Sequence, residues 1–132
     1  MAFNMDHKFT VTGPLQDLAI LHEEFGRSFG DEFLQREGPR IVLWLWCTNE
    51  EARSYARRVT QEYPNIMIGC TYWSEDLKAV GAAVYVIGEE EMAWEPTARK
   101  PTEKQIRQEL QGVVDRFLKI HEAEINTRPG TG

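Results

Sequence analysis

Hydrophobic and polar residues follow two periods along this chain, and each period predicts a different kind of element. In Lys8–Thr12, Phe9 and Val11 alternate with polar neighbours, as in a strand with one buried face. Every residue of Ile41–Cys47 is apolar, which is typical of a central strand buried on both faces. The predicted strands are Lys8–Thr12, Glu32–Arg36, Ile41–Cys47, Ile66–Trp73 and Lys78–Ile87, the last two forming a hairpin.

Three other segments repeat apolar residues every three or four positions and predict helices. The first follows Gly13-Pro14, and its stripe is Leu15, Leu18, His22, Phe25 and Phe29. The second begins at a capping box, Thr48 with Glu51 three residues later, and ends at Tyr63-Pro64. The third begins at a similar box, Thr102 to Gln105. Its stripe is Ile106, Leu110, Val113, Phe117, Ile120 and Glu124, widened by Val114 and Leu118.

This order of elements predicts an α+β fold: a ferredoxin-like βαββαβ antiparallel sheet with an added edge strand and a long C-terminal helix. We expect one domain over residues 1–125, with the ferredoxin-like core at 8–90, an acidic connector at 91–101 and the helix at 102–125. Residues 126–132 are expected to form a disordered tail. The last helix could cover the second face of the sheet, pack beside the other helices or meet a partner.

Composition and charge then exclude several classes of protein. The 132 residues carry a formal net charge of −6, which argues against direct binding of nucleic acid through its phosphates. No apolar run is long enough to span a membrane, and the first residues lack the pattern of a secretory signal. The two cysteines, Cys47 and Cys70, form no CxxC motif, so we expect a reducing, cytoplasmic location.

Several short motifs resemble those of the YubB-type ferredoxin-like proteins, small proteins of conjugative plasmids and phages. The similar segments are Phe9–Pro14, Tyr63–Ile66 and Gly88-Glu89, within about residues 8–90. One family motif, a tryptophan-serine-proline-proline start to a helix, is replaced here by Cys47–Glu50. The resemblance implies a ferredoxin-like fold and an origin in a mobile element, and it brings no catalytic residue.

No catalytic, metal-binding or cofactor motif is found in the sequence, so we predict a protein that is not an enzyme. The three histidines lack ligand spacing, and Gly26–Gly30 does not match a phosphate-binding loop. Cys47 precedes a predicted helix N-terminus, which can activate a thiol, although buried cysteines more often serve as small hydrophobic residues. An enzyme that uses Cys47 or a pair of carboxylates is therefore the least favoured hypothesis.

Acidic and aromatic residues are the candidates for partner binding. Glu89, Glu90, Glu91 and Glu95 lie within seven residues and include Trp94 between them. They form either a solvated surface or an acidic patch that attracts a basic partner.

The other aromatic candidates lie on predicted strands. Trp44 and Trp46 share one face of their strand, and we expect Trp73 and Tyr85 on neighbouring strands of that face. This face is either covered by the last helix or used for binding.

These observations predict a non-enzymatic protein-binding accessory protein of phage or plasmid origin. An inhibitor of a host defence complex, acting through an acidic surface that bears aromatic residues, would fit. Its partner would be another protein, with a basic nucleic-acid-binding protein favoured by charge. The alternative is a small-ligand or regulatory module with a pocket between the sheet and the C-terminal helix. A homodimer is left open.

Overall fold

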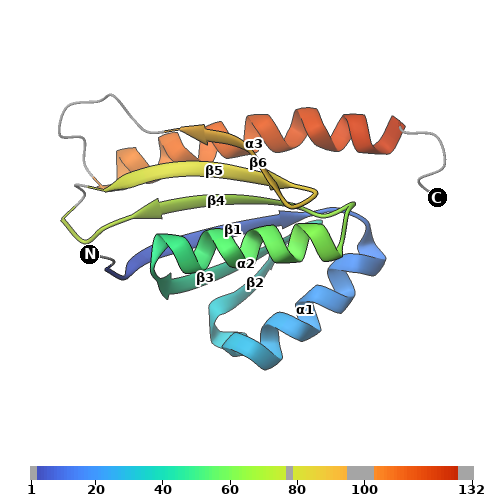
Figure 1. Cartoon of the computed structure of the whole chain (residues 1–132), viewed down its shortest axis with the longest axis horizontal. Helices are drawn as coiled ribbons and strands as arrows, with labels where there is room; N and C mark the ends of the chain where they lie inside the picture. The colour runs from blue at the N-terminus through green and yellow to red at the C-terminus, as the bar shows by residue number, and fades with distance from the viewer. Residues whose placement is uncertain (1–2, 77–78, 95–102, 128–132) are drawn as a thin grey trace.

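The computed structural model describes residues 3–76, 79–94 and 103–127, which form one six-stranded antiparallel sheet and three α-helices (Figure 1). The prediction of an α+β fold with an antiparallel sheet is confirmed. The strands are β1 (Met5–Thr12), β2 (Leu34–Glu37), β3 (Arg40–Cys47), β4 (Met67–Trp73), β5 (Val80–Val86) and β6 (Glu89–Trp94). The helices are α1 (Leu15–Phe29), α2 (Asn49–Glu62) and α3 (Glu103–Thr127), with a short 3-10 helix, η1, at Asp31–Phe33.

The strands are arranged in the order β2-β3-β1-β4-β5-β6, and every neighbouring pair is antiparallel. β1 pairs along its length with β3 on one side and with β4 on the other. β2 is short, and its pairing with β3 ends where Leu34 meets Leu43. Residues 44–47 of β3 therefore have no strand partner on their outer edge among the residues that the structure describes.

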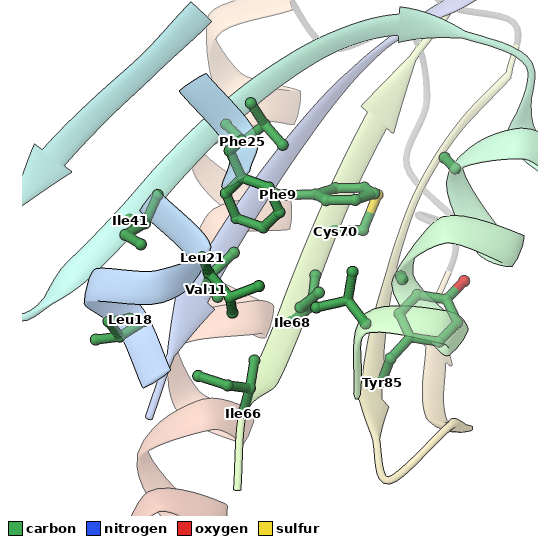
Figure 2. Close-up of a cluster of buried hydrophobic side chains, with 14 of the residues drawn as sticks. Phe9, Val11, Leu18, Leu21, Phe25, Ile41, Ile66, Ile68, Cys70 and Tyr85 are labelled. Atoms are coloured by element: carbon green, nitrogen blue, oxygen red, sulfur yellow. The ribbon is translucent and has the colours of Figure 1, made fainter. Parts of the chain in front are cut away.

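α1 and α2 cover one face of the sheet. Leu18, Leu21 and Phe25 of α1 are fully buried there, together with Phe9 and Val11 of β1. Figure 2 shows these side chains meeting between α1 and the strands, with Ile41, Ile66, Ile68, Cys70 and Tyr85 in the same cluster. Leu15, predicted to be in the stripe, is 67% exposed, because the buried face of α1 runs through Leu21 instead.

α3 lies against the opposite face of the sheet, over β4 and β5. Leu110, Val114 and Leu118 are completely buried, so the centre of the contact is one position away from the predicted Val113 and Phe117. Their partners on the sheet are Met67, Ala82, Val84 and Val86. Ile106, Ile120 and the capping residue Thr102 lie outside the residues whose side chains or backbone the structure describes.

The predicted capping box of α2 is confirmed. The Thr48 hydroxyl accepts a hydrogen bond from the Glu51 amide at 3.2 Å, and the Thr48 amide donates to the Glu51 carboxylate at 3.2 Å. Because Thr48 is the only residue between β3 and α2, this box turns the chain directly from the sheet into the helix.

The prediction of an acidic connector beginning at residue 91 is wrong in its first part. Residues 89–94 form the edge strand β6, which pairs with β5. The error arises because edge strands often carry charged residues that elsewhere indicate a loop. The rest of the predicted connector, 95–101, lies outside the described residues, and α3 continues to Thr127, two residues into the predicted tail. Among the described residues, no helix is long and apolar enough to cross a membrane.

Candidate functional site

An open apolar groove with a volume of about 480 Å³ lies against the unpaired edge of β3. Four consecutive residues, Trp44 to Cys47, line it. Because successive side chains of a strand point to opposite faces, a groove lined by consecutive residues follows the strand edge itself. The remaining lining residues come from the end of α1, from η1 and from α2: Phe29, Phe33, Glu51, Ala52 and Tyr55.

Aromatic rings build the wall of the groove opposite β3. Tyr55 of α2 meets Phe29 of α1 edge-to-face, with ring centroids 5.3 Å apart. Burial raises the pKa of the Tyr55 hydroxyl to about 12, so this side chain stays uncharged at neutral pH. Phe33 and Trp46 also line the groove and are 45% and 58% exposed. The groove thus presents large, exposed apolar rings beside free backbone.

Glu51 is the charged residue among those that line the groove. Hydrogen bonds from Thr48 lower the pKa of the Glu51 carboxyl, so it is ionised at neutral pH. The capping box therefore also fixes a negative charge at one end of an otherwise apolar surface.

The structure brings together the predicted aromatic residues on the α3 face, with one exception. Trp44 and Trp73 meet edge-to-face at 6.3 Å, and Trp46 lies farther along the same strand. Trp73 is buried, Trp44 is half-buried and Trp46 is exposed. The prediction for Tyr85 is wrong. In the register of β5 its side chain points to the α1–α2 face and joins the core in Figure 2.

Glu89, Glu90 and Glu91 lie on β6, and the strands β1, β4 and β5 separate this strand from β3. The glutamates of β6 therefore lie apart from Trp44 and Trp46 of β3. Glu90 is engaged within the fold, since it accepts a hydrogen bond from Tyr85 at 3.1 Å and pairs with Arg53 at 3.4 Å. Glu89 is exposed. Glu91 and Trp94 belong to β6, but their side chains lie outside the described part, as does all of Glu95.

A second pocket, of about 390 Å³, lies between the sheet and the first turns of α3. Its lining residues are Lys8, Thr71, Trp73, Lys104, Arg107, Gln108 and Gln111. The Arg107 guanidinium lies 4.7 Å from the ring centre of Trp73 and 5.4 Å from that of Trp44. The Lys8 ammonium lies 5.4 Å from the same Trp44 ring. Sequence periodicity does not indicate this cationic cluster, because Lys8 and Arg107 are far apart in the chain and only the docking of α3 joins them.

Cys47 lies beside His7, and a neighbouring histidine can activate a thiol by accepting its proton. Its Sγ atom is 3.8 Å from Nδ1 of the buried His7, whose Nε2 lies 2.9 Å from Oδ1 of Asn49. However, Nδ1 donates a hydrogen bond to the Met5 carbonyl at 3.0 Å, so it has no lone pair free to take the thiol proton. Burial, together with the charge of Glu51, raises the pKa of the Cys47 thiol to about 11. This arrangement fits a structural cysteine.

We expect Cys47 to react slowly at pH 8 and faster as the pH approaches 11. With the pKa raised from 9.0 to about 11, the thiolate fraction at pH 8 is far smaller than in an ordinary cysteine. Alkylation should be roughly 10- to 100-fold slower than in a short peptide, allowing for the greater nucleophilicity of a more basic thiolate. Iodoacetamide labelling of the folded protein, followed by mass spectrometry of the Cys47 peptide, measures this rate. A rate at pH 7 above that of the peptide would revive the enzyme hypothesis.

The described residues contain no group of three histidine, cysteine or carboxylate side chains that could hold a metal ion. The groove and the cationic pocket are two features of the described part of the chain with a shape and chemistry suited to binding. Comparisons with models of protein families, with curated proteins and with solved structures find no match to this chain.

Proposed function

We propose that this protein is a non-enzymatic protein-binding module that holds an extended segment of a partner protein in the groove beside β3. The observation that carries this proposal is the free edge of β3 at residues 44–47, which runs along an apolar groove. Unpaired strand edges bind extended peptides through backbone hydrogen bonds, and adjoining pockets select alternate side chains.

Trp46 and Phe33 are the expected anchors for the partner. Both rings are largely exposed in the free protein, although burial of a large aromatic side chain is strongly favourable. Tryptophan residues that become buried on binding are frequent hot spots of protein interfaces. The half-buried Leu45 and Cys47 would contact the peptide side chains that point to the other face.

Charge favours a basic residue in the bound segment. Glu51 lines the groove, and the whole chain carries a net charge of −6. A lysine or arginine at one end of the peptide would meet this carboxylate, and long-range attraction would speed association at low salt. The proposed ligand is therefore an extended apolar segment with a flanking basic residue.

Peptide display tests this function with a random library in place of a named partner. We expect peptides selected on the immobilised protein to alternate apolar and polar residues and to include lysine or arginine. Trp46→Ser should weaken their binding by at least tenfold, because the main exposed anchor is lost. Ile20→Ser is the matched control, since Ile20 is also exposed, at 52%, but lies on α1 and does not line the groove. Equal binding by the two variants would contradict the proposal.

The contribution of charge is measured separately with Glu51→Gln. Glutamine can still occupy the third helical position of a capping box, so α2 keeps its start while the charge is removed. We expect binding of the basic peptides to fall several-fold at low salt, with a smaller difference at high salt. A salt-independent loss would point to a damaged helix start instead.

We also propose a ferredoxin-like assignment for the segment from β1 to β4. Its element order, and the strand order β2-β3-β1-β4 with every neighbouring pair antiparallel, support it. β5 and β6 would then extend the sheet beyond β4. Origin in a mobile element and inhibition of a host defence complex stay predictions, supported by the sequence resemblance and by the proposed binding mode.

A further inference from the structure

The strand registers identify the backbone groups that β3 exposes at its free edge. Glu37 and Arg40 flank the two-residue turn between β2 and β3, so they form a pair that exchanges both backbone hydrogen bonds. Because successive residues direct their backbone groups to opposite edges of a strand, Val42, Trp44 and Trp46 also face away from β1. Val42 is covered by β2, whereas Trp44 and Trp46 lie beyond its end. Two amides and two carbonyls are therefore free at this edge within the described part of the chain.

The other side of the sheet gives the same alternation. The Ser74 amide donates a hydrogen bond to the Ala79 carbonyl at 2.8 Å, which directs the backbone groups of Ser74 toward the start of β5. The neighbouring Trp73 therefore faces β1, where it is paired with Asp6. The next residue of β1 faces β3 and is paired with Leu45, so the backbone groups of Leu45 face inward. Its neighbours on β3, at positions 44 and 46, must then face outward.

An antiparallel segment from a partner would satisfy all four of these free groups. Its residues opposite Trp44 and Trp46 would each exchange two hydrogen bonds with β3. In a parallel segment the bonds are slanted, so the Trp44 amide would need the carbonyl of a residue opposite Leu43. Leu34 of β2 already occupies that position. Because a backbone group without a partner inside a complex costs free energy, the register favours the antiparallel direction.

The same register decides which side chains of the bound segment enter the groove. Directly opposed residues of neighbouring strands point to the same face of a sheet. Leu45 and Cys47 both point to the α1–α2 side, where Phe29 and Tyr55 line the groove. A residue opposite Leu45 would therefore enter between these rings. A residue opposite Cys47 would point to the same side, where the Glu51 carboxylate also lines the groove.

From these observations we infer that the partner segment binds antiparallel to β3 and carries a basic residue two positions before a large apolar residue. This inference rests on the proposed binding of a peptide in the groove. The apolar side chain enters the groove opposite Leu45, and the basic side chain meets Glu51 from the position opposite Cys47. The segment runs from the start of α2 toward β2, and it ends or leaves the sheet before the position that Leu34 occupies.

Two chemical scans of one peptide test the direction. The probe is the tightest-binding peptide from the display experiment, and its affinity for the full chain is measured by isothermal titration. N-methylation removes one backbone donor at a time, and alanine substitution removes one side chain at a time. We expect N-methylation to weaken binding about tenfold at each of the two residues that flank the large apolar residue, because these residues donate to carbonyls of β3. Alanine should have its largest effect at the apolar residue itself.

A parallel segment would give a different result in the same scans. The residue opposite Leu45 would then both donate to β3 and enter the groove, so both scans would have their maximum at that residue. Coinciding maxima would overturn the antiparallel direction and leave the proposed function intact if Trp46→Ser still weakens binding relative to Ile20→Ser. Loss of that dependence on Trp46 would overturn the proposed function and this inference together.

The position of the basic residue is tested with Glu51→Gln and with a peptide in which glutamine replaces that residue. Both changes remove the same ion pair, so we expect the combined loss of affinity at low salt to be smaller than the product of the two single losses. A peptide of reversed sequence should bind about tenfold more weakly, because its basic residue would then lie opposite Leu43 and away from Glu51. Independent losses, or equal binding of the reversed peptide, would overturn the inferred order of residues.

Discussion

Gly69→Ala is expected to destabilise the protein by about 1–3 kcal/mol, although it adds only one methyl group. A Cβ at Gly69 would overlap Cγ1 of Val114 and lie 3.3 Å from Cδ1 of Leu118. Val114 is fully buried and stiff at χ1, so it cannot turn away without displacing α3. Urea denaturation followed by circular dichroism measures the change in the free energy of unfolding.

Val114→Ala provides the matching half of a double-mutant cycle. Alone, this substitution should lower the free energy of unfolding by about 2 kcal/mol, since it leaves a cavity under α3. In the double variant the methyl group introduced by Gly69→Ala occupies part of that cavity. We therefore expect the double variant to be more stable than the sum of the two losses predicts, by about 0.5–3 kcal/mol. Simple additivity would mean that α3 does not pack over β4 at Gly69.

Phe9→Ala is expected to have the largest effect, a loss of about 3–5 kcal/mol. Phe9 is completely buried on the central strand β1 (Figure 2). Its ring stacks on Tyr55 with centroids 6.4 Å apart. Since small domains have a total stability of about 5–15 kcal/mol, this variant would be partly unfolded at physiological temperature. The free energy of unfolding of this variant should therefore be measured by chemical denaturation at low temperature, where the variant is still folded.

Phe33→Ala is the control for Phe9→Ala. Phe33 is 45% exposed on η1, so its removal should cost less than about 1 kcal/mol of stability. It also lines the groove, and peptide binding should fall in this variant while the fold is retained. A loss of stability equal to that of Phe9→Ala would contradict the burial described for the two rings.

Local sequence signals predict most of the elements but not how they meet. The strand at β3 and the capping box at Thr48 are determined by neighbouring residues, and both are confirmed. The prediction that β3 is buried on both faces holds for Ile41–Leu43 but is wrong for Trp46, which is exposed. β6 is not predicted from the sequence because a run of glutamates is typical of a solvated loop. Its pairing with β5 makes this segment a strand. The face of Tyr85 depends on the register of β5, which single-strand periodicity does not determine.

The candidate sites likewise combine residues that local sequence predicts with an arrangement that only the tertiary structure determines. Strand alternation indicates Trp44 and Trp46 as binding residues, and both line the groove. The groove itself exists because β2 ends opposite Leu43 and leaves the next residues of β3 unpaired, a consequence of tertiary arrangement. The cationic pocket likewise depends on α3 crossing to the second face of the sheet. Long-range packing therefore creates both binding features from residues with ordinary local patterns.

Hydrogen exchange at residues 44–47 tests the central claim most directly. The amides of this segment that point outward from β3 should exchange rapidly in the free protein, because no strand in the described part of the chain covers them. When a peptide from the display experiment saturates the protein, we expect strand addition to slow exchange there by at least tenfold, with little change in β6. Unchanged exchange at residues 44–47 in the saturated complex would contradict binding at this edge.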